Sequence, residues 1–181
     1  MKNIFSKLFQ KSVSQKPMVI KPLNININQT PEKFQHFATE IVEFLIPKLQ
    51  MLDKIENDIF KKHQILETKR ISDNQTHPDE KKLWEEYAQR REEILNPITL
   101  KNHNGGSISF SKPTKYEYLN YPDTKIFFIM KSENRAIVET EFEEGIAKRE
   151  QFILKKDDMG WKIDEKKYSF AGEDTWQKDD I

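Results

Sequence analysis

Cysteine is absent from the chain of 181 residues, which excludes thiol nucleophiles, disulfides, redox motifs and cysteine-ligated zinc fingers. Glycine is scarce: the five glycines cannot supply a dinucleotide-binding fingerprint, and Gly105-Gly106 is too short for a phosphate loop. No apolar run approaches the roughly 20 residues that a membrane-spanning helix needs. The first residues look slightly like a signal peptide, but Lys7 and Lys11 interrupt the apolar stretch. We therefore predict a cytoplasmic protein, and the lack of cysteine fits that compartment.

An excess of charge of one sign is also missing from the chain as a whole, which has 30 basic and 30 acidic residues. This balance argues against a dedicated nucleic-acid-binding protein, whose binding face should be basic. The distribution is uneven, however, because residues 1–22 hold five lysines and no acidic residue. The rest of the chain therefore carries a net charge of −5.

The N-terminal segment, residues 1–30, is predicted to be a basic tail followed by a linker. Residues 1–17 place Ile4, Phe5, Leu8 and Phe9 on one side of a possible short helix, with lysines on the other. Contact with an anionic membrane surface is one interpretation, and a solvated tail is the favoured one.

Residues 31–95 read as two helices. Thr30, Pro31 and Glu32 form a helix start, with Thr30 as the N-cap. Pro47 should kink or split the first helix, because proline cannot donate a backbone hydrogen bond. The second helix begins near Pro78. The apolar residues that recur at helical spacing in the first helix are Phe34, Phe37, Ala38, Ile41, Leu45, Leu52, Ile55, Ile59 and Leu66.

After residue 100 the hydrophobic period becomes that of β-strands. Residues 125–131, 135–142, 148–156 and 161–170 are the strand candidates, with weaker ones at 107–110 and 116–121. Short turns join the later strands, so neighbours should pair antiparallel. We predict a single α+β domain over residues 31–170, with helices packed on one face of an antiparallel sheet. Residues 171–181 are predicted to be an acidic, frayed C-terminal tail.

Catalytic and metal-binding motifs are not found. The four histidines (His36, His63, His77 and His103) have no metal-ligand spacing, and no nucleophile elbow surrounds a serine. A general base on a concave sheet face remains possible, with Glu139 or Glu141 as candidates, although an exposed strand face is the favoured interpretation. We therefore predict no catalytic residue, no metal and no cofactor.

A family resemblance rests on the last three strands. Residues 135–142, 151–156 and 160–164, ending in Gly160-Trp161-Lys162-Ile163, resemble the nuclear transport factor 2-like fold, in which N-terminal helices pack into a curved, cone-like antiparallel sheet. The charged first helix and the segment 84–93 (WEEYAQRREE) are similar to immunity proteins that neutralise bacterial polymorphic toxins of the Rhs type. The resemblance covers residues 31–170.

The resemblance implies a binding protein rather than an enzyme, with a cognate toxin protein as its partner. Toxins of this kind are often basic nucleases, so an acidic surface would capture them by electrostatic steering. The strand and turn acids Glu139, Glu141, Glu143 and Glu144 are the predicted contacts. The alternative for these residues is a solvated edge that prevents strand aggregation.

A second hypothesis is a small-molecule-binding or enzymatic cone, similar to isomerases and dehydratases. It predicts a pocket that contains a carboxylate or histidine with a perturbed pKa. A cone filled by phenylalanine and tryptophan side chains would count against it.

Overall fold

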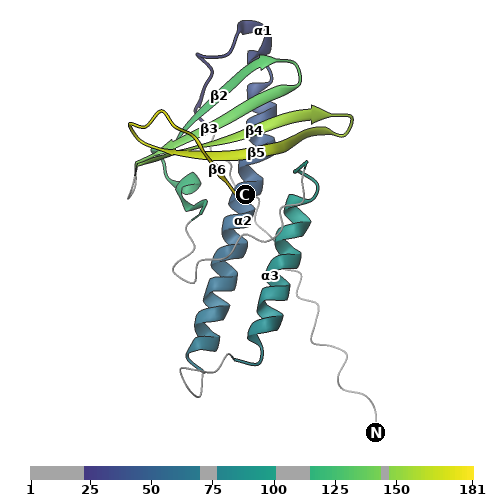
Figure 1. Cartoon of the computed structure of the whole chain (residues 1–181), viewed down its shortest axis with the longest axis vertical. Helices are drawn as coiled ribbons and strands as arrows, with labels where there is room; N and C mark the ends of the chain where they lie inside the picture. Colours follow the sequence, from purple (N-terminus) through teal and green to yellow (C-terminus); the bar gives the residue numbers. More distant parts are fainter. Residues whose placement is uncertain (1–22, 70–76, 101–114, 144–146) are drawn as a thin grey trace.

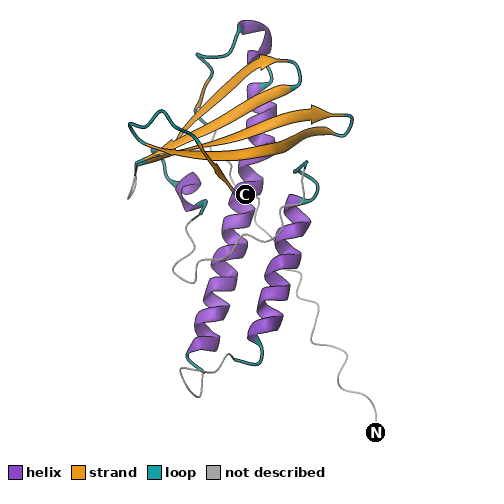
Figure 2. Cartoon of the chain, in the orientation of Figure 1, coloured by secondary structure: helices purple, strands orange, loops and turns teal. Residues whose placement is uncertain are grey.

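The computed structural model describes residues 23–69, 77–100, 115–143 and 147–181. Within these ranges, helices precede the sheet, which confirms the predicted α+β class (Figures 1 and 2). The elements that come before the main strands are β1 (Ile25–Asn26), α1 (Glu32–Gln35), α2 (Ala38–Glu67), α3 (Glu80–Leu95) and the 3₁₀ helix η1 (Glu117–Asn120).

The sheet has six described strands whose spatial order follows the chain. Strands β2 to β6 pair antiparallel, and β1 pairs parallel to β2. The expectation of a purely antiparallel sheet is therefore wrong at one edge. A parallel pair needs a long crossover, and here the crossover contains all the described helices. The bounds of the remaining strands are β2 (Lys125–Ser132), β3 (Arg135–Phe142), β4 (Lys148–Asp157), β5 (Gly160–Phe170) and β6 (Gln177–Asp179).

Strand periodicity sets which face of the sheet is buried. In β3, Ala136, Val138 and Thr140 are fully buried, while the residues between them are half-buried on the opposite face. This confirms the predicted alternation, since successive side chains of a strand point to opposite faces. The predicted hairpin turn before residue 161 is also confirmed: it joins β4 to β5, and Gly160 supplies a φ of +115°.

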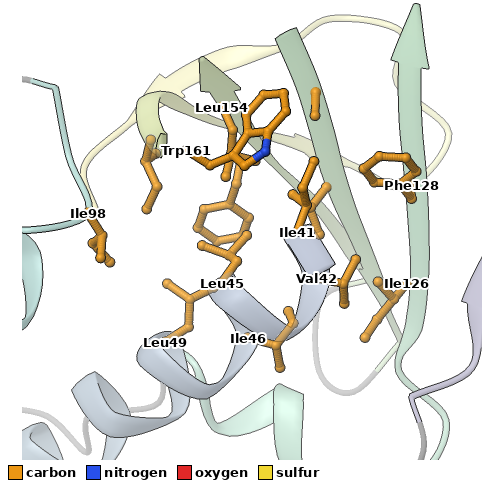
Figure 3. Packing of buried hydrophobic residues seen from close by; sticks show 14 of the residues in the cluster. Ile41, Val42, Leu45, Ile46, Leu49, Ile98, Ile126, Phe128, Leu154 and Trp161 are labelled. Carbon is orange, nitrogen blue, oxygen red and sulfur yellow. The ribbon is translucent and has the colours of Figure 1, made fainter. Parts of the chain in front are cut away.

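Helix α2 covers the inner face of the sheet. Five of its side chains (Ile41, Val42, Leu45, Ile46 and Leu49) are at most 1% exposed and point towards Phe128, Leu154 and Trp161 of the strands (Figure 3). Pro47 lies inside this helix, which does not split there. The buried residues on both sides of Pro47 hold the helix together, although the proline removes one intrahelical hydrogen bond.

Beyond the sheet, α2 continues beside α3 as a helical hairpin (Figure 1). A second, smaller core joins the two helices there, formed by Ile55, Ile59, Leu83 and Tyr87. No helix in the described ranges has the length and apolar composition needed to cross a bilayer.

Thr30 does not cap a helix, contrary to the prediction. Its hydroxyl donates to the Phe128 carbonyl (2.7 Å) and accepts from the Met130 amide (3.2 Å), and Pro31 occupies the N-cap position of α1. Thr30 is 3% exposed, so burial against β2 replaces the capping role.

Two other segments differ from the predictions. Residues 116–121 contain η1 instead of a strand, because their backbone hydrogen bonds are local: the amides of Leu119 and Tyr121 donate to the carbonyls of Tyr116 (3.1 Å) and Tyr118 (3.0 Å). The expected frayed end forms β6 and finishes with Ile181 only 1% exposed. Strands β1 and β6 lie outside the predicted range 31–170, yet both belong to its sheet. The predictions for residues 1–17 and 107–110 lie outside the described residues.

Candidate functional site

An acidic hollow of about 520 Å³ lies at one end of the sheet, between the end of β3 and the loop between β5 and β6. These two segments of the backbone lie at the left in Figure 1. Four carboxylates line it: Glu141 and Glu143 from the end of β3, and Glu173 and Asp174 from the loop. The apolar part of its wall is formed by Phe142, Ala147 and Ala171. We call this set of nine described residues, which also includes Arg149 and Gly172, the acidic hollow.

Among the nine described residues of the acidic hollow, Arg149 is the one with a positively charged side chain. Its guanidinium donates to the Glu173 carbonyl oxygen (2.5 Å) and lies 5.1 Å from the ring centre of Trp176. These two contacts fix the loop between β5 and β6 against β4. The Glu173 and Asp174 side chains are not needed for that attachment, which uses the backbone of Glu173.

Three of the four predicted contact residues lie on described strands or just after them. The Glu141 carboxylate accepts from Lys125 (2.7 Å), and Glu143, 79% exposed in its side chain, lies 3.6 Å from the same ammonium. Glu139 points from the same face of β3 and accepts from Gln151 (2.8 Å), outside the hollow. Glu144 lies outside the described residues.

The structure thus brings Glu141 and Glu143 together with two acids that the sequence prediction missed. Glu173 and Asp174 are about 30 residues further along the chain. The only sequence signal for these two residues is the acidic composition of residues 171–181, which by itself predicts a frayed tail.

A second polar group lies inside the molecule, between the sheet and the helices. Lys166 of β5 and Glu150 of β4 are each 1% exposed, with 3.3 Å between ammonium and carboxylate. Lys166 also donates to Asp179 of β6 (2.6 Å), while Lys148 (2.9 Å) and Tyr118 (3.0 Å) donate to Glu150. We call these five residues the interior ionic cluster. Each buried charge has a partner of opposite charge, as the low-dielectric interior requires.

Ionisation in this interior is strongly perturbed. Burial, together with the neighbouring charge of Lys166, lowers the pKa of the Lys115 ammonium to about 8. Burial also raises the pKa of Glu56, against the opposing charge of Lys115. Burial acts to raise the pKa of Asp179, but the charge and hydrogen bond of Lys166, together with the charges of Lys115 and Lys148, lower this pKa overall. Perturbed groups of this kind concentrate at functional sites, although structural ion pairs perturb a pKa in the same way.

Chemically, the two sites differ in access. The acidic hollow is open to a macromolecular partner and carries side chains that bind cations by charge and hydrogen bonding. The interior ionic cluster is closed around Glu150 and Lys166, and Phe128, Phe152 and Trp161 fill much of the space between sheet and helix. Such filling favours a structural role for the cluster over a substrate site.

No model of a known protein family, no curated protein and no solved structure matches the chain significantly.

Proposed function

We propose that this protein is an immunity protein with a nuclear transport factor 2-like cone, and that it neutralises a cognate bacterial toxin domain by binding it at the acidic hollow. The observation that carries the proposal is the convergence of Glu141, Glu143, Glu173 and Asp174 around one concave surface. The fold supports the resemblance, since helices precede the sheet, α2 packs on its inner face and Trp161 enters the core.

The chemistry of the hollow suits a basic partner. Carboxylates concentrated in a concavity focus the electrostatic field, which accelerates association with a positively charged surface. An inserted arginine or lysine of the partner would meet two pairs of carboxylates and lay its methylene groups on Phe142. Toxins that act on nucleic acids present such side chains, so occupation of their basic substrate surface would block them.

Toxin rescue in cells tests this function. The tagged protein is used to capture its partner from the lysate of the producing organism, and the partner's gene is then expressed in a test bacterium. We expect the partner to kill the cells when alone and to be harmless when the wild-type protein is co-expressed. A variant with lysine in place of Glu141, Glu143, Glu173 and Asp174 should lose the rescue.

A matched control reverses the same number of charges elsewhere. Glu40, Glu85, Glu92 and Glu93 are exposed on α2 and α3, and their replacement by lysine should leave the rescue intact. Thermal unfolding of both variants checks that they fold. Full rescue by the hollow variant would rule out the hollow as the contact surface, and a partner that is harmless alone would rule out the immunity function.

A ligand-binding or enzymatic cone is the second candidate, supported by one observation: Lys115, with its pKa of about 8, and Glu56 are ionisable groups in the interior. Mass spectrometry of the denatured, purified protein tests it by looking for a released small molecule. A molecule present in the wild type and lost in Lys115→Met would favour this candidate. Equal recovery from the variant would exclude Lys115 as part of a binding site.

A further inference from the structure

Three metal-ligating side chains meet where the helical hairpin turns, far from the acidic hollow. His63 and Glu67 lie four residues apart on α2, so they share one face of that helix. Glu80, the first residue of α3, faces them from the neighbouring helix. One ligand atom from each residue lies within 4.8 Å of the other two.

The distances from His63 to the two carboxylates match the edges of a metal coordination sphere. His63 Nε2 lies 3.5 Å from Glu67 Oε1 and 3.4 Å from Glu80 Oε1. Ligands about 2.0–2.1 Å from a tetrahedral zinc ion lie about 3.3–3.4 Å from each other.

The three residues are partly shielded from water and are supported by a neighbouring side chain, as metal ligands in proteins usually are. The side chains of His63 and Glu80 are only 9% and 10% exposed, so two ligands are withdrawn from water. The Trp84 indole lies against the His63 ring, with 5.4 Å between ring centres, and donates to Glu80 Oε1 (3.4 Å). A hydrogen bond to a ligating carboxylate is the outer contact that orients metal ligands. The Glu67 side chain, 38% exposed, leaves the third side open towards solvent.

We propose that His63, Glu67 and Glu80 bind a divalent transition-metal ion, with zinc as the best match, and that a water molecule completes its coordination. One imidazole nitrogen and two carboxylate oxygens are ligands that zinc accepts, and the ion balances two carboxylates in a poorly solvated place. The ion would link the end of α2 to the start of α3. This site is independent of the toxin-binding function proposed above.

Isothermal titration of the full-length, EDTA-treated protein with ZnCl₂ tests the proposal. We expect one ion per chain, and an affinity at least tenfold lower in Glu80→Gln and in His63→Gln. Cobalt substitution provides a readout of coordination itself: Co²⁺ should give the intense visible absorption of a tetrahedral site in the wild type and lose it in both variants. Bound Co²⁺ should also quench the fluorescence of the adjacent Trp84.

Matched controls separate the site from adventitious binding. His36→Gln removes an exposed histidine, and Glu85→Gln removes an exposed carboxylate of α3, so both should keep wild-type affinity. Circular dichroism in EDTA checks that every variant folds without metal. The proposal fails if the wild type shows no zinc binding in the micromolar range, or if His36→Gln lowers the affinity and His63→Gln does not.

Discussion

At the scale of single residues, Lys166 is the charged side chain whose burial has the largest desolvation cost, because its side chain is fully buried. Glu150 and Asp179 neutralise it, and its Nζ lies 5.2 Å from the ring centre of Tyr116. A buried ion pair is not by itself strong evidence of stability, because desolvation of both charges offsets their attraction. Removal of one partner has a much larger effect, since the remaining buried charges lose part of their compensation.

Lys166→Met should therefore lower the free energy of unfolding by about 3–5 kcal/mol, because Glu150 and Asp179 lose their shared cation. Urea denaturation at pH 7 measures the change. In the double variant with Glu150→Gln the loss should be smaller than the sum of the two single losses. A loss below about 1 kcal/mol in Lys166→Met would show that the remaining carboxylates are solvated or protonated at little cost.

Lys115 should have the opposite effect on stability. Its pKa is about 8 in the folded protein and about 10.5 when unfolded, so folding disfavours the charged form below pH 8. Between pH 8 and 10.5 the unfolded chain binds more protons at this residue, and the Lys115 contribution to stability rises with pH. Lys115→Met should thus stabilise the protein by about 1–3 kcal/mol at pH 7.

The advantage of Lys115→Met should shrink as the pH rises from 8 towards 10.5 and disappear well above 10.5, where the wild-type amine is neutral in both states. Urea unfolding of both proteins at pH 7 and pH 10 measures this. A constant difference at the two pH values would mean that the substitution acts through packing and not through charge.

At the scale of elements, the prediction from sequence was accurate where a strand or helix carries its own pattern. Strands β2 to β5 are each eight or more residues long, with clear alternation of burial through β2 and β3, and α2 and α3 have continuous apolar faces. Strands β1 and β6 have two and three residues. Segments this short are too short to show a hydrophobic period in the sequence. They form strands because each pairs with the edge of a longer strand, β1 with β2 and β6 with β5.

The same limit applied to the candidate site. Glu141 follows the alternation of one strand and Glu143 belongs to the turn directly after it, so both are predictable from sequence, whereas Glu173 and Asp174 reach the acidic hollow only through the β5–β6 loop. The contacts that hold this loop, from Arg149 to Glu173 and Trp176, join residues more than 20 positions apart. Likewise, His63 and Glu80 meet only because α2 and α3 pack together.

The helical hairpin depends on its own small core, so it should open separately from the sheet. Ile59→Ala removes a fully buried side chain from that core and should cost about 2–4 kcal/mol. Hydrogen exchange should show faster exchange of amides in α3 and the second half of α2, with β3 and β4 unchanged. Leu45→Ala, in the main core, is the control and should accelerate exchange in the sheet as well. Equal acceleration everywhere in Ile59→Ala would indicate one cooperative unit.

At the scale of the whole molecule, the two proposed binding sites lie in different parts of the protein. The acidic hollow lies at an end of the sheet, and the helical hairpin extends away from the sheet along the long axis (Figure 1). A toxin bound at the hollow would therefore leave the hairpin tip uncovered. Under this arrangement, metal binding at His63 and toxin binding should not compete.

Association with the captured partner should depend steeply on salt. Between about 50 and 500 mM NaCl, we expect the association rate constant of the wild type to fall about tenfold or more, because screening weakens the field of the hollow. The variant with four lysines in the hollow should associate more slowly, and its rate should not fall with salt. Stopped-flow mixing measures both rates. A wild-type rate that does not change with salt would mean that the hollow does not steer the partner.

The parallel pairing of β1 with β2 has a consequence for how the chain assembles. The two hydrogen bonds of the Thr30 hydroxyl to β2 span 98 and 100 residues, and the intervening chain holds α1, α2, α3 and η1. Short turns join strands β2 to β5, so these strands can pair early in folding. Pairing of β1 with β2 closes a much longer loop, and the entropic cost of that closure is offset only when the core is nearly complete. Strand β1 is therefore the final piece to join, and the first to leave when the chain is pulled from its N-terminal side.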